Sequence, residues 1–361
     1  MSLRAVLAAA LLSLATGAMA ADPVRLKAVS PDGDRAVVVY RSLWAEISLG
    51  QGGDALPLYP PRGCAWTSAS YQPNGELLAL TGYCPPVRAA CDDARALLYT
   101  SPAFDRPKRA FAAAKTRWEG VMWRSGGDDL AVIETPLVAP LATSLGDLNR
   151  RNLSCANGTP RFAVLDPGRK ARIKLDITPR EWSPRRIIAA DLSTLVAIVR
   201  IAPTTAQVGP IRDQLNEICK SRADQPSHLA AICRAPGTEK LIKWRDGEWT
   251  MDENAALHPG RRLVGPGGEA IRERCTVQII SGRAKTACAI EIDGETGLQR
   301  VIEAANGMLG DIALSRDELF SLNSTHGVRV PHFHAYDLKS GGMRDLSHLL
   351  DLRQFATLPS Q

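Results

Sequence analysis

Three histidines near the C-terminal end are the residues whose type and spacing most readily suggest chemistry. They are His326, His332 and His334. If His332-Phe333-His334 is extended, the imidazoles at its two ends point to the same face of a strand. Imidazole is a ligand of zinc and copper, so this cluster could hold a metal for hydrolase or lyase chemistry. No carboxylate or cysteine at a fixed spacing completes the set, and the alternative is that the histidines belong to the surface or to turns.

Two pairs of carboxylates offer a second kind of site. Asp92-Asp93 and Asp128-Asp129 lie next to predicted turns, where calcium could bind. Carboxylates in that position more often accept hydrogen bonds from the N–H groups of the turn, and we expect that role here. The sequence contains no nucleophile elbow, phosphate-binding loop, dinucleotide fingerprint or H-E-x-x-H helix. We therefore expect no cofactor.

The N-terminal segment predicts export. Arg4 precedes an uncharged apolar run from Ala5 to Leu14, and Ala18-Met19-Ala20 supplies a cleavage pattern of small residues. This combination is typical of a secretory signal peptide over residues 1–20. No other window approaches the ~20 apolar residues that a transmembrane helix needs. We expect the mature chain, residues 21–361, to be periplasmic or secreted, without a transmembrane anchor.

The charge pattern argues against nucleic acid as a partner. The formal net charge is +6, from 44 Lys and Arg against 38 Asp and Glu. A nucleic-acid footprint gathers its basic residues on one element. Here the signs alternate along the chain, and dense basic pairs such as Arg169-Lys170 and Arg185-Arg186 lie in predicted turns.

The eight cysteines predict disulfides rather than a metal cluster, because their number is even, none forms C-x-x-C, and the chain carries an export signal. Cys275 and Cys288 flank a turn at Ser281-Gly282-Arg283, so the two would face each other across a hairpin. Cys219 and Cys233 could join two short helices.

The other four cysteines leave two pairings open. Either Cys64 pairs with Cys84 and Cys91 with Cys155, or Cys84 pairs with Cys91 and Cys64 with Cys155.

A recurring turn, each time followed by a buried strand, must position all of these groups. Ser30-Pro31-Asp32-Gly33-Asp34-Arg35 leads into Ala36-Val37-Val38-Val39-Tyr40, a tight polar turn before a run rich in β-branched residues. Later copies of the pattern are Gln72–Glu76 before Leu77–Leu80, Arg124–Asp128 before Leu130–Ile133, Trp182–Arg186 before Ile187–Ala189, Gly265–Glu269, and Ser315–Glu318 before Leu319–Leu322.

This repeat predicts an all-β fold, a six-bladed β-propeller. A unit of roughly 40 to 50 residues, with short apolar runs bounded by Gly, Pro, Asp and Asn, matches a four-stranded blade better than a helical solenoid. Seven blades is the alternative if the stretch from Arg180 to Met251 holds two.

One segment departs from the strand pattern. Within Val208 to Ala235, the residues Ile211, Leu215 and Ile218 fall on one face of a helix, and Pro226 marks the start of a second. We expect residues 208–235 to form a small α-helical hairpin inserted in the propeller, which either covers a blade edge or contacts a partner.

Two stretches resemble a known repeat. Trp182-Ser183-Pro184-Arg185-Arg186-Ile187-Ile188-Ala189 and Ser30-Pro31-Asp32-Gly33 look like the W-S-P-D-G-x-x-I-A turn of TolB-type, WD-like β-propeller repeats. The similarity covers most of the mature chain as a repeat pattern, while the α/β domain that precedes the propeller in TolB itself has no room here. The resemblance implies a periplasmic scaffold that binds protein or peptide at the loops around its central channel.

These observations favour a non-enzymatic scaffold in the cell envelope. It would act as a monomer and bind a protein, peptide or glycan partner through loops and channel-rim side chains. The alternative, from another class, is an enzyme in the propeller funnel whose metal is held by His326, His332 and His334.

Overall fold

The computed structural model describes residues 24–350, except 51–53, 87–90, 139–154, 176–181, 202–237, 252–261, 265–269, 281–282, 295–296, 305–308 and 325–330. Within this part of the chain almost all regular structure is β-strand. The strands form six sheets, and each sheet is built from consecutive segments of the chain.

The first three sheets are antiparallel. The first contains β1 (Val24–Val29), β2 (Arg35–Tyr40), β3 (Leu43–Ser48) and β4 (Ala55–Leu58). The second contains β5 (Ala65–Tyr71), β6 (Leu77–Cys84), β7 (Arg95–Pro102) and β8 (Lys108–Ala114). The third contains β9 (Thr116–Trp123), β10 (Leu130–Val138), β12 (Arg161–Asp166) and β13 (Ala171–Leu175), with the short β11 (Ala156–Asn157) also paired to β10.

The other three sheets repeat this order. The fourth contains β14 (Trp182–Ala190), β15 (Thr194–Ile201), β16 (Thr238–Arg245) and β17 (Glu248–Met251). The fifth contains β18 (Arg262–Val264), β19 (Ala270–Ile280), β20 (Arg283–Gly294) and β21 (Gly297–Glu303). The sixth contains β22 (Asp311–Leu314), β23 (Glu318–Asn323), β24 (His332–Asp337) and β25 (Met343–Asp345). The described 3₁₀ turns are η1 (Cys91–Asp93) and η3 (Ser347–Leu349).

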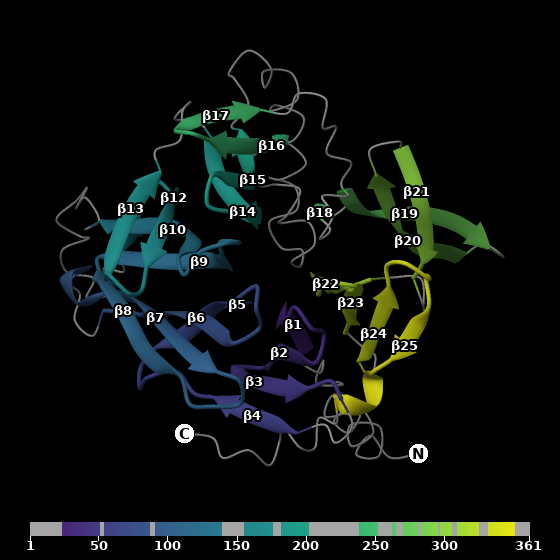
Figure 1. The fold of residues 1–361 in the computed structure, drawn as a ribbon, viewed down its shortest axis with the longest axis horizontal. Helices are drawn as coiled ribbons and strands as arrows, with labels where there is room; N and C mark the ends of the chain where they lie inside the picture. The colour runs from purple at the N-terminus through teal and green to yellow at the C-terminus, as the bar shows by residue number, and fades with distance from the viewer. Residues whose placement is uncertain are drawn as a thin grey trace, which may run out of the picture.

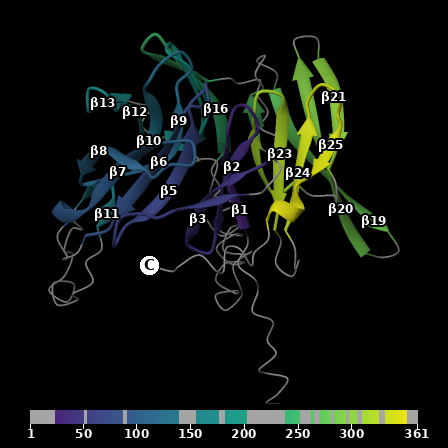
Figure 2. The ribbon, with the colours of Figure 1, turned by 60° about the horizontal axis from the view of Figure 1, so that its bottom comes forward.

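The sheets are arranged radially, with the first strand of each toward the centre (Figure 1). Neighbouring first strands contact one another: β1 meets β5, β5 meets β9, β9 meets β14, β14 meets β18, and β1 meets β22. The last contact brings the sixth sheet back to the first, as the tilted view also shows (Figure 2). The described strands therefore form a six-bladed β-propeller, as the turn repeat predicts.

Burial on both faces explains why the strands after the turns are apolar throughout. In β2, Val37 and Val38 are fully buried although they point to opposite faces of the sheet. Val37 packs in a cluster shared with the second sheet, and Val38 packs in one shared with the sixth. A blade between two neighbours has no solvent face, so its central strands need no polar alternation.

The turn after β1 is held by its own side chains. The Ser30 hydroxyl accepts a hydrogen bond from the Arg35 N–H at 2.9 Å and also contacts the Asp32 carboxylate. Gly33 has a φ of +77°, which is strained for other residues, and a Cβ there would meet the Glu318 carboxylate at 3.1 Å. Asp32 therefore stabilises the turn through its contact with Ser30, whereas Gly33 is favoured because the backbone there has a positive φ.

Turns of successive sheets bond to one another at the same end of the ring, which we call the turn end. The backbone N–H of Arg316 donates to the Pro31 carbonyl at 2.8 Å, and so links the sixth sheet to the first. Gln72 donates to Asp128 at 3.0 Å, which links the second sheet to the third. The N–H of Ser125 donates to the Ala190 carbonyl at 3.0 Å, which links the third sheet to the fourth.

The opposite end, where the first strand of each sheet begins, is called the start end. Here Asp311 joins the sixth sheet to the first: its carboxylate accepts from Arg25 Nε at 2.8 Å and from the Leu26 N–H at 3.2 Å. Among the described strands, none is exchanged between these two sheets. The ring therefore closes by side-chain packing and polar contacts rather than by a shared sheet.

The turn predicted at the fourth copy of the pattern is wrong. Trp182–Arg186 does not form a turn, because it lies inside β14, the first strand of its sheet. The pairing with β15 shifts between Pro184 and Arg186, which marks a bulge. Proline lacks a backbone donor and is tolerated at a bulge in a strand at the edge of its sheet. The turn follows β14 instead, where the Asp191 carboxylate accepts from the N–H of Thr194 at 2.6 Å.

The structure tests the predicted number of blades, while several other sequence predictions concern residues that it does not describe. The strands described between Arg180 and Met251 form one sheet, so the described part of the chain has six blades and gives no seventh. The helical hairpin predicted at 208–235, the signal peptide at 1–20 and the turn at 265–269 lie outside the described residues. Among the helices that the structure describes, none is long and apolar enough to cross a membrane.

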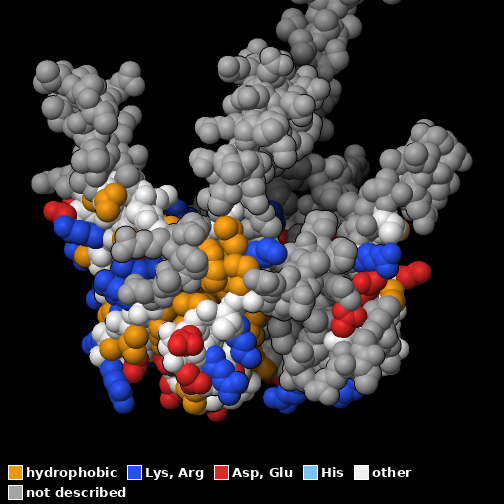
Figure 3. All heavy atoms as spheres, turned by 90° about the horizontal axis from the view of Figure 1, so that it is seen from above, with side chains coloured by type: hydrophobic (Ala, Val, Ile, Leu, Met, Phe, Trp, Pro, Cys, Tyr) orange, Lys and Arg blue, Asp and Glu red, His pale blue; other side chains and the backbone are white. Residues whose placement is uncertain are grey.

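The described side chains on the side of the fourth sheet carry mixed charge. Seen from the side of the fourth sheet, Lys and Arg side chains are interspersed with Asp, Glu and hydrophobic ones (Figure 3). This surface lacks the single basic face that a nucleic-acid footprint would present on the visible side chains.

Candidate functional site

The predicted histidine cluster is brought together only in part. His332 and His334 lie on one face of β24, with rings nearly parallel and centroids 6.2 Å apart. His334 Nε2 lies 4.0 Å from an Asp345 carboxylate oxygen. Burial lowers the pKa of His334, the nearby His332 lowers it further, and Asp345 opposes both. His326 lies outside the described residues.

Metal binding by these histidines stays a prediction. Within the described part of the chain, no three His, Cys, Asp or Glu side chains gather in a group that could hold a metal ion. The acidic pairs take other roles. Asp92 forms an ion pair with Lys115 at 2.5 Å, and Asp129 forms one with Arg124 at 2.6 Å.

The cysteines of the first three sheets form the first of the two pairings left open by the sequence. Cys64 is bonded to Cys84 and Cys91 to Cys155, with Cα atoms 4.1 and 5.5 Å apart. Both disulfides lie at the start end, where they tie the ends of strands to neighbouring loops.

The other cysteines are described in part. Cys275 and Cys288 are direct cross-strand partners in the β19–β20 pairing, as the hairpin prediction requires, and Cys288 is disulfide-bonded. Cys219 and Cys233 lie outside the described residues, so their predicted bridge stays a prediction.

A pocket of about 500 Å³ at the start end has the chemistry of a binding site. It opens between the first three sheets, and we call it the basic pocket. Its charged and aromatic lining residues are Arg25, Lys27, Arg41 and Arg117 together with Trp44, Trp66 and Tyr83. Among the described residues that line it, none is Asp or Glu.

The first strands place the basic residues. In β1 the burial alternates, so that Val24 and Leu26 face the core while Arg25 and Lys27 are exposed. Arg117 occupies the second position of β9. Because neighbouring first strands contact one another and begin at the same end, residues far apart in the sequence meet in this pocket.

Aromatic rings hold the cations in place. The Lys27 ammonium lies 5.4 Å from the centre of the Trp44 ring, and the Arg117 guanidinium lies 5.6 Å from the centre of the Tyr83 ring. Such cation–π contacts stabilise a charge that has lost part of its water. Trp66 serves as a wall: it is buried, and its indole N–H donates to the Leu58 carbonyl at 2.8 Å.

Carboxylates near the pocket engage only part of this charge. Arg25 pairs with Asp311 at 2.8 Å, and Arg117 Nη2 pairs with Glu119 at 2.6 Å. Arg117 Nε is buried and has no hydrogen-bond partner. Buried donors are rarely left in that state in native proteins, so this nitrogen marks a place for an acceptor.

Lys27 shows the electrostatic result. Although Lys27 is exposed as a residue, its ammonium is partly buried, and this partial burial lowers the pKa of the ammonium. The adjacent Arg25 lowers it further, and Asp311 partly opposes them. In this site, desolvation and repulsion from a neighbouring cation therefore both destabilise the charged form of Lys27. This arrangement favours a negatively charged ligand.

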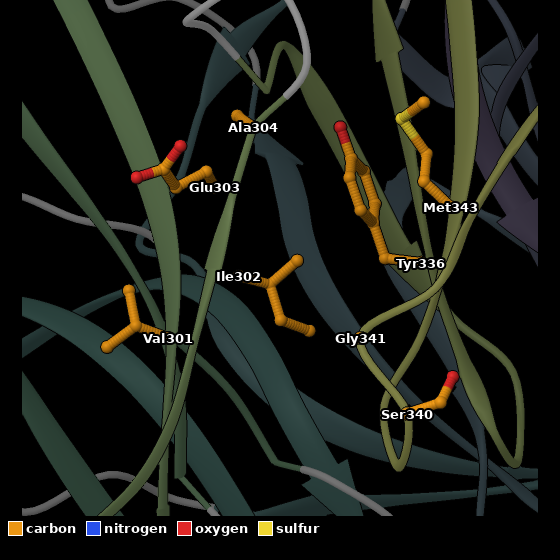
Figure 4. Close-up of a pocket in the computed structure, with 8 residues that line it drawn as sticks. All are labelled: Val301, Ile302, Glu303, Ala304, Tyr336, Ser340, Gly341 and Met343. Carbon is orange, nitrogen blue, oxygen red and sulfur yellow. The ribbon is translucent and has the colours of Figure 1, made fainter.

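A second hollow lies between the fifth and sixth sheets. Its volume is about 590 Å³, and its walls come from β21 and from the β24–β25 hairpin. Ile302 points across the gap toward Tyr336, and Met343 stands beside the tyrosine (Figure 4). Among the described residues of this lining, Glu303 is the one charged side chain. The hollow exposes polar and apolar surface in about equal amounts and lacks the converging charges of the basic pocket.

The sequence analysis missed the basic residues of the pocket. The available signal was the alternation of Arg25 and Lys27 with apolar neighbours just before a predicted turn. This signal identifies exposed positions in an inner strand. It does not show that Arg41 and Arg117 join them, because that depends on the ring.

Comparisons with known proteins support the fold. No protein-family model and no curated protein matches the chain. Among solved structures, prolyl oligopeptidase B from Galerina marginata, bound to a macrocyclization substrate, is similar with a TM-score of 0.50 and 9% identity. The match covers 94% of this chain and 53% of that one, so this chain spans about half the length of that enzyme.

Two similar structures are TolB proteins. TolB from Acinetobacter baumannii matches with a TM-score of 0.46 and 9% identity, over 94% of this chain and 67% of that one. A TolB from Agrobacterium tumefaciens matches with a TM-score of 0.39 and 11% identity, over 90% and 80%. At these identities the similarity concerns the fold alone. The six radial sheets make the described part of the chain a six-bladed β-propeller.

Proposed function

We propose that the protein is an exported, non-enzymatic propeller that binds a protein or peptide partner in the cell envelope. The observation that carries this proposal is the basic pocket, where side chains from three separate blades converge at the start end. The disulfides and the signal-like N-terminus support a location outside the cytoplasm.

The binding mechanism is rigid presentation. The first strands are packed against neighbours on both sides, so they hold Arg25, Lys27 and Arg117 in place before a partner arrives. A prearranged site loses little conformational entropy on binding. The disulfide between Cys64 and Cys84 adds stiffness beside the pocket, next to Tyr83 and Ala65.

Site-specific photo-crosslinking in the producing cell tests this proposal. A photoreactive residue in place of Lys27, exposed in β1, is compared with one in place of Lys174, exposed in the outer strand β13. We expect a discrete adduct from position 27 and none from position 174. Adducts at both positions, or none at position 27, would contradict a partner site at the start end.

The enzyme alternative has its own observation, the parallel stacking of His332 and His334 beside Asp345. Metal analysis of the purified mature protein tests it. Stoichiometric zinc or copper that is lost in the His332→Ala, His334→Ala double variant would favour a metal-dependent enzyme over the scaffold.

A further inference from the structure

The basic pocket also indicates the class of ligand, an inference that rests on the proposed function. We infer that it binds a carboxylate carried by an acidic peptide segment of the partner. Four cations line the pocket and, among the described lining residues, no carboxylate does. Its volume of about 500 Å³ lies in the range of ligand sites and exceeds the space that a single small ion fills.

Arg117 supplies the most specific part of the argument. Its Nη2 is engaged by Glu119 at 2.6 Å, while the buried Nε has no partner. A guanidinium binds a carboxylate best through two adjacent N–H groups. The Nε donor, which the protein itself leaves without a partner, is the kind of group that a carboxylate oxygen satisfies.

Another arginine of the third sheet shows what an occupied guanidinium looks like. Arg161 uses both Nε and Nη2 on a single oxygen of Glu134, at 2.9 and 2.6 Å. Glu134 is completely buried and also accepts from Arg172 at 3.0 Å. The protein itself engages both nitrogens of the Arg161 fork, whereas Arg117, which lines the pocket, leaves its Nε without a partner.

The aromatic rings favour an acidic peptide over a sugar. A sugar ring binds on the open face of an aromatic side chain. Here Lys27 lies over Trp44 and Arg117 over Tyr83, while Trp66 is buried and packs edge-on against Tyr99 at 5.2 Å. Cations cover the rings of Trp44 and Tyr83, and Trp66 forms part of the wall. The pocket therefore presents positive charge to a ligand.

Calorimetric titration provides the test. The probe is an acetylated tripeptide amide, Asp-Glu-Asp, and its matched control is the neutral tripeptide Asn-Gln-Asn. We expect the acidic tripeptide to bind at least about tenfold more tightly, because hydrogen bonds to charged groups are at stake, and the difference to shrink as salt is added. Inorganic phosphate forms a third arm, and equal or tighter binding of phosphate would overturn the carboxylate assignment.

Variants locate the binding. Arg117→Gln is expected to weaken the acidic tripeptide about tenfold or more, while Arg169→Gln, at a side chain 87% exposed on an outer turn, leaves affinity unchanged. If Arg117→Gln fails to fold, Lys27→Met carries the same prediction. Unchanged affinity in the folded variants would place the peptide elsewhere and overturn the inference.

The two proposals fail in different ways. Equal affinity for acidic and neutral tripeptides, together with crosslinks from position 27, overturns the ligand class and leaves the partner site standing. Tight binding of the acidic tripeptide without any crosslink in the cell supports the carboxylate subsite and contradicts the envelope partner.

Discussion

The two ends of the propeller use arginine in opposite ways. At the turn end, Arg35 donates to Glu46 at 3.4 Å and to the Gly75 carbonyl, and its guanidinium lies 5.1 Å from the Tyr71 ring centre. At the start end, Arg117 keeps a buried Nε without a partner. An arginine whose guanidinium is bonded by buried groups of its own chain supports the fold, while one with a donor left without a partner can serve a ligand.

The ends also differ in how they are fastened. Hydrogen bonds between turns hold the turn end, as in the bond from Gln72 to Asp128. The start end is held by the two disulfides of the first three sheets, Cys64–Cys84 and Cys91–Cys155. Covalent bonds fix the strand ends there without using up the cations of the basic pocket.

The largest effect is expected from removing the charge of Arg35. Glu46 is fully buried and also accepts from the Tyr71 hydroxyl at 2.9 Å and from the Phe104 N–H at 3.0 Å. Arg35→Met leaves this carboxylate without its cation, so the free energy of unfolding should fall by about 3–5 kcal/mol. Urea denaturation measures it. A loss below about 1 kcal/mol would show that the turn end does not depend on this pair.

Loss of the Cys64–Cys84 disulfide should come next. The bond closes a loop with a sequence separation of 20, and opening such a loop costs about 3 kcal/mol through the entropy of the unfolded chain. The Cys64→Ser, Cys84→Ser double variant is compared with wild type by thermal unfolding. If polar contacts hold the start end instead, the melting temperature of the double variant would hardly differ from that of wild type.

Gly33→Ala should have a smaller effect, confined to the turn end. The residue has a φ of +77° and a new Cβ would press on Glu318 at 3.1 Å, so we expect a loss of about 1–2 kcal/mol in the free energy of unfolding. Gly63→Ala is the matched control at the start end, since its φ is +76° with nothing within 4 Å of the added Cβ. A greater loss of unfolding free energy in Gly63→Ala than in Gly33→Ala would contradict this prediction.

The smallest effect concerns pH. Burial lowers the pKa of His334 from its ordinary value of 6.5. The unfolded chain therefore takes up this proton first as the pH falls, and stability decreases as the pH drops below about 6.5. His334→Gln should flatten this part of the stability curve, while His348→Gln, at an exposed histidine, should not. Identical curves for wild type and His334→Gln would exclude the effect.

Local patterns predicted most of the fold. Runs such as Val37-Val38-Val39 after a Pro-Asp-Gly turn specify a buried strand by themselves, and the structure places β2 there. The same approach failed at Trp182–Arg186, because a proline beside serine and arginine has the composition of a turn but occupies a bulge in β14. Composition does not distinguish a turn from a bulged edge strand.

Local sequence patterns predicted little of the candidate site. Type and spacing pointed to His332 and His334, which the structure brings side by side. Arg25 and Arg117 carry no motif, and they meet only because their strands begin at the same end of a closed ring. Neither the ring geometry nor the unfilled Nε of Arg117 can be read from neighbouring residues.

The most direct test of the difference between the two ends needs no ligand. Lys27→Met keeps the apolar stem beside Trp44 and removes a charge that burial and Arg25 disfavour. Its free energy of unfolding, measured beside that of Arg35→Met under the same conditions, should stay within about 0.5 kcal/mol of wild type or rise. A loss as large as that of Arg35→Met would show that the cations at the start end are structural, and would contradict the binding site proposed for them.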